Sequence, residues 1–318
     1  MLCHAIAFLE ALMKHHQLIP IAGLAATIAI AVGCVVQLAG EAADPRVIAG
    51  GPFESSGVAY VPGSRGVLFV DDGRRQQIFW MELSTDGAQQ GSAVPVALGA
   101  DVMDLEGITS NRTHFYVVGS QSKATGFDSD GLVRFRFNAG TRQVEGLERV
   151  QGLKQWLAAN VAELRGADRQ KGKQAMNIEG LAWDPVNQRL LMGLRTPIID
   201  GRALVIPVTL IDPAAPLTTA NLRVDGGKAI RLALDGAGIR SLEYDEPSKA
   251  FHVIAGAGAN SGNGDFRILE WKGEGQSELR ELARFPGELK PEGITRATLD
   301  GRSVRLVVFD TGRYAMLD

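Results

Sequence analysis

Residues 179–197 read EGLAWDPVNQRLLMGLRTP, and residues 292–312 read EGITRATLDGRSVRLVVFDTG. In both stretches a Glu-Gly pair opens an apolar run, a turn follows, and a second apolar run leads into another turn. Three further stretches repeat this pattern, and they begin at Ser56, Glu106 and Ser241. The five starting points are 50, 73, 62 and 51 residues apart. Such self-similarity indicates a repeat architecture with one supersecondary unit in each repeat.

A period near 50 residues with two longer intervals predicts one four-stranded propeller blade per repeat. Third strands are expected at QIFWMEL (77–83), LVRFRFN (132–138), ALVIPVTL (203–210), FRILEW (266–271) and RYAML (313–317). Fourth strands are expected at 93–98, 144–150, 228–234 and 278–285. Short β-rich runs separated by turn residues favour antiparallel sheet.

The last repeat reaches Asp318 without room for a fourth strand, whereas RVIAGG at 46–51 precedes the first repeat unassigned. We expect this N-terminal strand to complete the last blade, which closes the ring and removes an open sheet edge. The predicted fold is therefore all-β: a five-bladed propeller over residues 44–318, with six blades as the alternative count.

The interval of 73 residues contains LKQWLAANVAEL at 153–164. Its apolar residues fall on one helical face. We expect a helical insertion at about 151–175, which either caps the site or packs on the rim of the propeller. The residues of that face are Leu153, Trp156, Leu157, Val161 and Leu164.

Composition excludes several kinds of function. The 318 residues hold 33 Lys and Arg against 36 Asp and Glu, so the chain lacks the positive excess that a phosphate backbone requires, and no nucleic-acid partner is expected. Its two cysteines, Cys3 and Cys34, both precede the repeats, which excludes a disulfide, a zinc–thiolate site or a cysteine nucleophile within them. Three of the five histidines also precede the repeats. Chemistry in the propeller must therefore rely on oxygen ligands and carboxylates.

The segment from 18 to 40, LIPIAGLAATIAIAVGCVVQLAG, contains no charged residue. It is long enough to span a bilayer core of about 30 Å, Lys14 precedes it and small residues follow it. Residues 1–43 are therefore predicted to be a signal peptide or a membrane anchor, with lipid attachment at Cys34 as a third alternative. We expect an exported bacterial domain, periplasmic or anchored on the outer face, that meets a membrane only through this segment.

The residues that open the five repeats are expected at the starts of the innermost strands, where equivalent positions project into the central channel. They are Ser56, Glu106, Glu179, Ser241 and Glu292. Converging carboxylates repel one another unless a cation compensates them, and oxygen ligands suit Ca²⁺, with Mg²⁺ as the alternative. Under the other interpretation, these side chains bond to backbone amides and hold the blades together without metal. We expect the glycine that follows Ser56 and each glutamate to allow close backbone approach.

The order Ser, Glu, Glu, Ser, Glu around five blades resembles the central calcium site of the calcium-activated nucleotidase (apyrase) family. Members of that family are secreted or lumenal five-bladed propellers that hydrolyse nucleoside di- and triphosphates. The resemblance covers the ring and the blade count, and it implies that the five ring residues ligate a metal. The chain also resembles a bacterial domain-of-unknown-function family that is similar to phytase-like esterase propellers. This resemblance rests on the sequence NIEGLAWDP (177–185) followed by LLMGLRTP (190–197).

Loops between second and third strands are expected on the same face as the ring, and they carry charged residues. The cations Arg74, Lys123, Arg195 and Arg313 are candidates for binding an anionic small molecule. Asp71 and Asp310 are candidates for a catalytic base beside a metal. The alternative is that these charges are solvated loop residues without a function in binding.

Two functions follow from these expectations. One is a calcium-dependent hydrolase of phosphate esters or anhydrides that acts on the top face of the propeller. The other is a non-catalytic propeller whose metal is structural and whose top face binds a ligand or a protein.

Overall fold

The computed structural model describes residues 44–122, 131–256 and 264–317. The chain divides into two units, Met1–Leu38 and Ala39–Asp318, and all described residues belong to the second. The predicted leader at 1–43 and Lys123 lie outside the described residues. Within the described part of the chain, no helix is both long and apolar enough to cross a bilayer.

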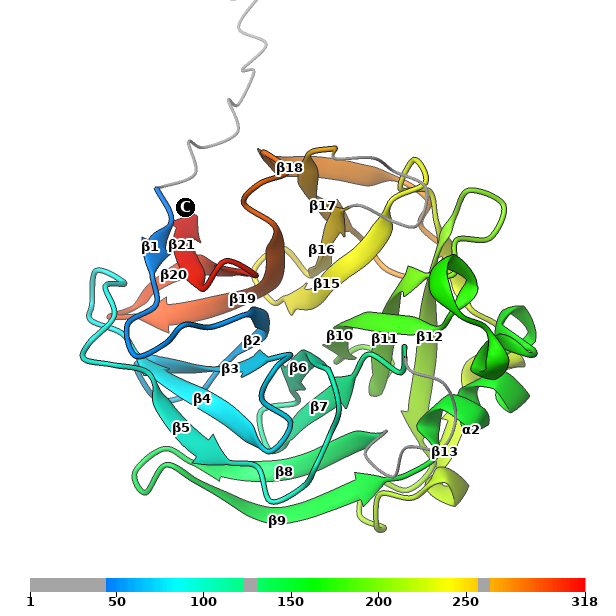
Figure 1. The fold of residues 1–318 in the computed structure, drawn as a ribbon, viewed down its shortest axis with the longest axis horizontal. Coiled ribbons are helices and arrows are strands. Elements are labelled where there is room, and N and C mark those ends of the chain that lie inside the picture. The colour runs from blue at the N-terminus through cyan, green and yellow to red at the C-terminus, as the bar shows by residue number, and fades with distance from the viewer. Residues whose placement is uncertain (1–43, 123–130, 257–263, 318) are drawn as a thin grey trace, which may run out of the picture. The chain divides into compact units, whose positions relative to one another are not determined.

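Five antiparallel sheets follow one another around a ring, and each sheet is one blade (Figure 1). The first blade consists of β2 (Ser55–Tyr60), β3 (Gly66–Asp71), β4 (Gln77–Glu82) and β5 (Val94–Ala97). The second consists of β6 (Leu105–Ser110), β7 (Phe115–Gly119), β8 (Leu132–Asn138) and β9 (Gln143–Val150). In both blades the strands pair in chain order, as the repeat pattern predicted.

The third blade has a divided outer edge. It consists of β10 (Asn177–Asp184), β11 (Arg189–Thr196) and β12 (Ala203–Leu210), with β13 (Leu222–Val224) and β14 (Ile230–Leu232) both paired to β12. The 3-10 turns η4 (Thr219–Asn221) and η5 (Asp225–Gly227) flank β13. The fourth blade is regular, with β15 (Gly238–Asp245), β16 (Ala250–Gly256), β17 (Phe266–Trp271) and β18 (Leu279–Phe285).

The fifth blade closes the ring with both ends of the described chain. It consists of β19 (Pro291–Leu299), β20 (Arg302–Phe309), β21 (Arg313–Leu317) and the N-terminal strand β1 (Arg46–Val47). In this sheet Arg46 pairs with Tyr314 and Val47 with Arg313. The blade count of five and closure by the N-terminal strand are therefore confirmed.

The helical insertion between the second and third blades contains helix α2 (Leu153–Asn160) and three 3-10 turns. The turns are η1 (Ala162–Leu164), η2 (Ala167–Arg169) and η3 (Gly172–Gln174). The predicted apolar face is buried: Leu157 and Leu164 pack in one cluster with Ile178 and Leu190 of the third blade. The insertion thus packs against the side of this blade, which favours the rim alternative over a cap.

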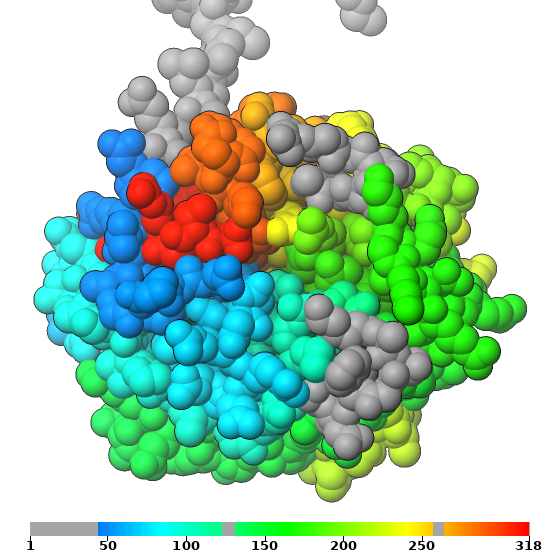
Figure 2. Space-filling model, in the orientation of Figure 1, coloured from blue at the N-terminus to red at the C-terminus, as the bar shows by residue number. Residues whose placement is uncertain are grey.

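The core is divided into five apolar clusters, one at each junction between neighbouring blades. The second strands of the first four blades are buried almost throughout because a blade covers them on either side, whereas β20 of the fifth blade is buried only in its second half. Val70 of the first blade and Val117 of the second, for example, meet in one cluster. Since buried apolar area stabilises at about 25 cal/mol per Å², these junctions hold the ring and fix the channel-facing strand starts. In the space-filling view, segments of all five blades meet around the middle of the ring (Figure 2).

Candidate functional site

All five innermost strands have a register irregularity close to their start, and in four of them it displays a charged side chain. In β6, Leu105 faces Gly119 while Gly107 faces Val118, so Glu106 is an extra residue without a partner. Glu179 in β10 and Glu292 in β19 are extra residues in the same way. An extra residue of this kind is a β-bulge, which re-aims a side chain. The repeated Glu-Gly motif therefore encodes a bulge at the mouth of the channel.

The fourth blade corrects the predicted ring by one residue. In β15, Ile239 faces Ala255 and Ser241 faces Ile254, so the extra residue is Arg240. Ser241 takes the position that glycine holds in the other blades, and its Oγ accepts a hydrogen bond from the Ile294 amide at 3.3 Å. The ring order is thus Ser, Glu, Glu, Arg, Glu. The order on which the resemblance to the nucleotidases rests is not the order that the blades present.

The glycines behind the ring are required by close contact between neighbouring inner strands. A Cβ on Gly107 would lie 2.7 Å from the Cβ of Leu181, and one on Gly293 would lie 2.9 Å from the amide nitrogen of Val58. These distances are too short for any side chain, so the close approach predicted at these positions is confirmed.

A cavity of about 680 Å³ opens at the bulged ends of the inner strands. Its lining residues are Ser56, Asp72, Glu106, Glu179, Arg195, Arg240, Gly264, Asp265, Phe266, Gly287, Glu288, Lys290, Glu292 and Asp310. Four of the five predicted ring residues are among them, and Ser241 is not. The cavity is therefore built at the predicted place, from loops and strand starts of all five blades.

Arg240 binds two of the ring carboxylates. Its Nη1 lies 3.0 Å from Oε2 of Glu179, and its Nε donates to Oε2 of Glu292 at 2.7 Å, while Nη2 donates to Oε1 of Glu292. The contact with Glu179 Oε2 is an ion pair whose angles do not make a hydrogen bond. Burial opposes the charge of Arg240, but the two carboxylates outweigh it and raise the pKa of the guanidinium. Glu179 and Glu292 thus have an internal counter-charge.

Neighbouring side chains hold this arrangement in place. The second oxygen of Glu179, Oε1, accepts hydrogen bonds from Arg195 Nη1 at 3.1 Å and from Asn177 Nδ2 at 3.0 Å. The ring of Phe266 lies 6.0 Å from Cζ of Arg240, within range of a cation–π contact. A Cβ on Gly256 would lie 2.2 Å from that ring, so this glycine makes room for it.

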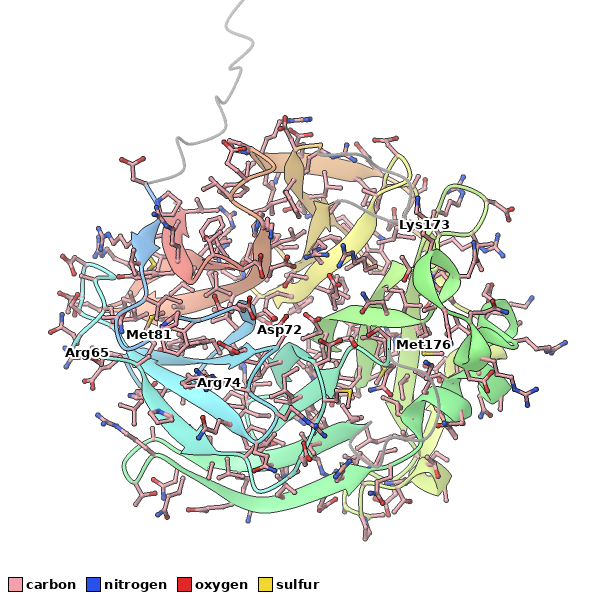
Figure 3. All side chains as sticks on the ribbon, in the orientation of Figure 1. Arg65, Asp72, Arg74, Met81, Lys173 and Met176 are labelled. Carbon is pink, nitrogen blue, oxygen red and sulfur yellow. The ribbon has the colours of Figure 1, made fainter. Side chains whose placement is uncertain are left out.

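On another part of the ring, three further carboxyl groups meet. Asp72, Asp104 and Glu106 each offer an oxygen, and these oxygens all lie within 4.8 Å of one another. Oδ1 of Asp72 is buried and has no hydrogen-bond partner among the described residues. In the view down the ring, Asp72 lies near its middle (Figure 3). We refer to these three residues as the acidic triad.

The pKa values of the acidic triad reflect burial and mutual repulsion. Burial raises the pKa of Asp72 to about 7, with further contributions from Glu54, Asp104 and Asp71. Burial raises the pKa of Glu106 well above its usual range, and Glu179 and Asp104 add to the effect. Converging acids of this kind are stabilised either by protons or by a bound cation. Their all-oxygen donor set fits Ca²⁺ or Mg²⁺.

Asp104 is set by the backbone around it. It has a left-handed backbone with φ of +59°, and its carbonyl accepts the amide of Ser120 at 2.8 Å. Its Oδ2 accepts hydrogen bonds from the hydroxyls of Ser120 and Ser122, the second at 3.1 Å. These bonds fix one carboxylate oxygen and orient the group next to Glu106.

The predicted catalytic carboxylates lie in different surroundings. Asp71 is the buried last residue of β3, where its carboxylate accepts hydrogen bonds from the amides of Glu54 at 2.9 Å and Gly73 at 3.1 Å, and it does not line the cavity. Asp310 does line the cavity, and its Oδ2 accepts a hydrogen bond from Lys290 Nζ at 2.7 Å.

Of the predicted anion-binding cations, Arg195 lines the cavity. Arg74 instead lines a separate, shallower depression of about 300 Å³, and it lies farther from the middle of the ring than Asp72 (Figure 3). Arg313, in the fifth blade, is directed to the carbonyl of Pro45 at 3.5 Å and does not line the cavity. The two residues were predicted from loop position alone, which does not fix the direction of a long side chain.

Six charged residues of the site were not among the predicted ones: Asp72, Asp104, Arg240, Asp265, Glu288 and Lys290. For Arg240 the sequence held a usable signal. Trp183-Asp184 in the third blade matches Tyr244-Asp245 in the fourth at an interval of 61 residues, which aligns Glu179 with Arg240. Asp104 and Lys290 each stand two residues before a ring glutamate.

The chain is similar to several solved structures at low sequence identity. The soluble aldose sugar dehydrogenase of Escherichia coli in its apo form is 11% identical, with a TM-score of 0.47 over 86% of this chain and 98% of that one. A nidogen/laminin complex is 13% identical, with a TM-score of 0.42 over 81% and 73% of the two chains. A gluconolactonase of Xanthomonas campestris is 12% identical, with a TM-score of 0.42 over 89% and 82%.

A search of curated proteins found no match. A family described as a protein of unknown function, DUF3616, matches residues 155–314, which is half of the sequence and includes the bulges at Glu179, Arg240 and Glu292. The chain belongs to this family.

Proposed function

We propose that the acidic triad binds a divalent cation, Ca²⁺ or Mg²⁺, and that the cavity uses this cation to act on a small anionic ligand. The observation that carries the proposal is the convergence of three carboxyl oxygens within 4.8 Å of one another. In addition, Oδ1 of Asp72 is buried and has no hydrogen-bond partner among the described residues. Burial, together with repulsion between the acids, raises the pKa of Asp72 and Glu106, and a cation there would oppose both effects.

The chemistry that fits this arrangement is hydrolysis of a phosphate ester or anhydride. A hard cation polarises a phosphoryl oxygen and orients water. Asp310 lines the same cavity and is our candidate base, with Lys290 holding its Oδ2. The water oxygen would bond to phosphorus as one of its protons passes to Asp310, the bond from phosphorus to the leaving oxygen would break, and the leaving oxygen would take up a proton from solvent water.

A second candidate function is binding without catalysis. It is favoured by the hydrogen bonds of Asp71, whose carboxylate accepts two backbone amides and stabilises a loop. Only one of the two predicted bases therefore faces the cavity. In this alternative the cation orders the mouth of the channel, and the ligand is bound and released unchanged.

Two measurements separate these functions. Titration of the metal-free protein with Mg²⁺ and with Ca²⁺ should show one bound cation per chain, and Asp72→Asn should abolish it. Phosphate release from a panel of phosphate monoesters, pyrophosphate and nucleotides then distinguishes hydrolysis from binding. Asp310→Asn should abolish release while the cation still binds. Binding of a cation without release from any substrate would support the second function, and absence of cation binding would refute both.

We further propose that the propeller acts after export, on the basis of the uncharged segment at 18–40. Fractionation of cells that express the full chain should place it outside the cytoplasm. Recovery of the intact chain from the cytoplasmic fraction would contradict this.

A further inference from the structure

The cationic side chains that line the cavity already form ion pairs with carboxylates, whereas direct binding of an anion requires cations that can pair with it. Within the described residues, three cationic side chains line the cavity, and a carboxylate lies against each of them. Arg240 is bound to Glu179 and Glu292, and Arg195 also contacts Glu179. Lys290 is bound to Asp310. An incoming anion would have to compete with an existing partner at every one of these positions.

The formal charge of the cavity lining also disfavours direct binding of an anion. Seven described carboxyl groups line the cavity against three cations, so the lining is formally four charges negative when all are ionised. The carboxyl groups are Asp72, Glu106, Glu179, Asp265, Glu288, Glu292 and Asp310. Clefts focus such a field because their walls have a low dielectric constant, and this field repels anions.

A divalent cation at the acidic triad changes both conditions at once. Its two positive charges offset two of the negative charges of the cavity lining. It also retains free coordination positions, since Mg²⁺ takes six ligands and Ca²⁺ about six to eight, whereas the triad supplies one oxygen from each of three residues. An oxyanion can fill these positions without displacing any of the three cationic side chains from its partner.

We propose that the ligand of this cavity is a small oxyanion that binds through the cation, so that anion binding requires prior cation binding. The inference rests on the proposed cation site and adds the order of binding and the ligand chemistry. Phosphate and carboxylate groups share this chemistry. Because coupling between two ligands is reciprocal, the anion should tighten the binding of the cation by the same factor.

The test is isothermal titration of the purified propeller with inorganic phosphate, first in the presence of a chelator and then at saturating Mg²⁺. A titration without protein corrects for association between Mg²⁺ and phosphate in solution. We expect at least a tenfold tighter phosphate affinity with Mg²⁺, and the same factor for Mg²⁺ when phosphate is present. Asp72→Asn should abolish Mg²⁺ binding and the enhancement.

Asp101→Asn is the matched control, because Asp101 is an exposed acid paired with Arg75 and does not line the cavity. It should leave both affinities unchanged. Equal phosphate affinity with and without Mg²⁺ would overturn the inference while the cation site stands. The same holds if Mg²⁺ binds but phosphate binds in neither state. Failure of the wild-type protein to bind Mg²⁺ or Ca²⁺ would instead refute the proposed function itself.

Discussion

The carboxylates at the mouth of the channel fall into two groups that solve the same electrostatic problem differently. Glu179 and Glu292 share the guanidinium of Arg240, which the fourth blade displays from its own bulge. Asp72, Asp104 and Glu106 also converge, but none of the ion pairs between described residues includes them. The comparison teaches that acids on the axis of a propeller do not by themselves indicate a central metal, since a neighbouring blade can supply the counter-charge. The group without this counter-charge is the one for which we propose a bound ion.

The first way to break this comparison is to remove the internal counter-charge. Arg240→Met removes the cationic partner of the buried Glu292 and leaves the buried Glu179 with Arg195 alone, and we expect the free energy of unfolding to fall by about 3–5 kcal/mol. Urea denaturation measures the effect. Arg195→Met is the matched control: its side chain is 37% exposed against 11% for Arg240, so its loss should cost below about 1 kcal/mol. Equal costs for the two substitutions would show that Arg240 is not the counter-charge.

His252, which does not line the cavity, also makes the free energy of unfolding depend on pH. Its contribution must be measured before the pH dependence of the two carboxylate groups is compared. His252 is 1% exposed, and burial lowers its pKa to about 4, although Asp245 opposes the shift. The neutral ring is therefore favoured in the folded state. Its contribution is complete above pH 6.5 and is lost as the pH falls from 6.5 towards 4, by up to about 3 kcal/mol.

Denaturation of wild-type protein and of His252→Leu across this pH range checks the assignment. The variant should lose most of the acid dependence. Wild-type dependence retained in the variant would place the responsible group elsewhere.

The acidic triad should respond to cations as the Arg240 group does not. A ligand that binds only the folded state at 100 times its dissociation constant stabilises by about 2.7 kcal/mol. Mg²⁺ or Ca²⁺ should therefore raise the melting temperature of the wild-type protein but not that of Asp72→Asn. Without cation, Asp72→Asn should be as stable as wild type or more stable, because it removes a repelling charge. Glu288→Gln, at a cavity acid outside both groups, should keep the response. Loss of the response in both variants would indicate general charge screening.

The smallest effects are expected at the two arginines that the sequence singled out but the structure places outside the cavity. Arg74→Ala and Arg313→Ala should change phosphate affinity at saturating Mg²⁺ by less than about twofold, because distant surface charges are screened at physiological salt. Calorimetry measures this directly. A tenfold loss in either variant would mean that these side chains reach the ligand.

Most of the fold was predictable because the same sequence pattern repeats in each blade. Alternating apolar runs marked the strands, and the unassigned strand at 46–51 identified how the ring closes. In the third blade, β14 lies within the fourth strand expected at 228–234, but the division of this edge was not predicted, because β13 has only three residues and gives too short a pattern.

The site was predictable only where it repeats. The Glu-Gly pairs mark the bulges at Glu106, Glu179 and Glu292, but Arg240-Ser241 departs from the motif, and a shift of one residue hid the counter-charge. Asp72 and Asp104 belong to loops with no common pattern. The left-handed backbone that orients Asp104 is not visible in its residue type.

The most direct test of the central claim is an anomalous difference map from a crystal of the propeller soaked in Mn²⁺, which substitutes for Mg²⁺ and Ca²⁺ at oxygen sites. We predict a peak within coordination distance of Asp72, Asp104 and Glu106, and none between Glu179 and Glu292, where Arg240 lies. A peak between Glu179 and Glu292 with Arg240 displaced, or no peak at the acidic triad, would contradict the claim.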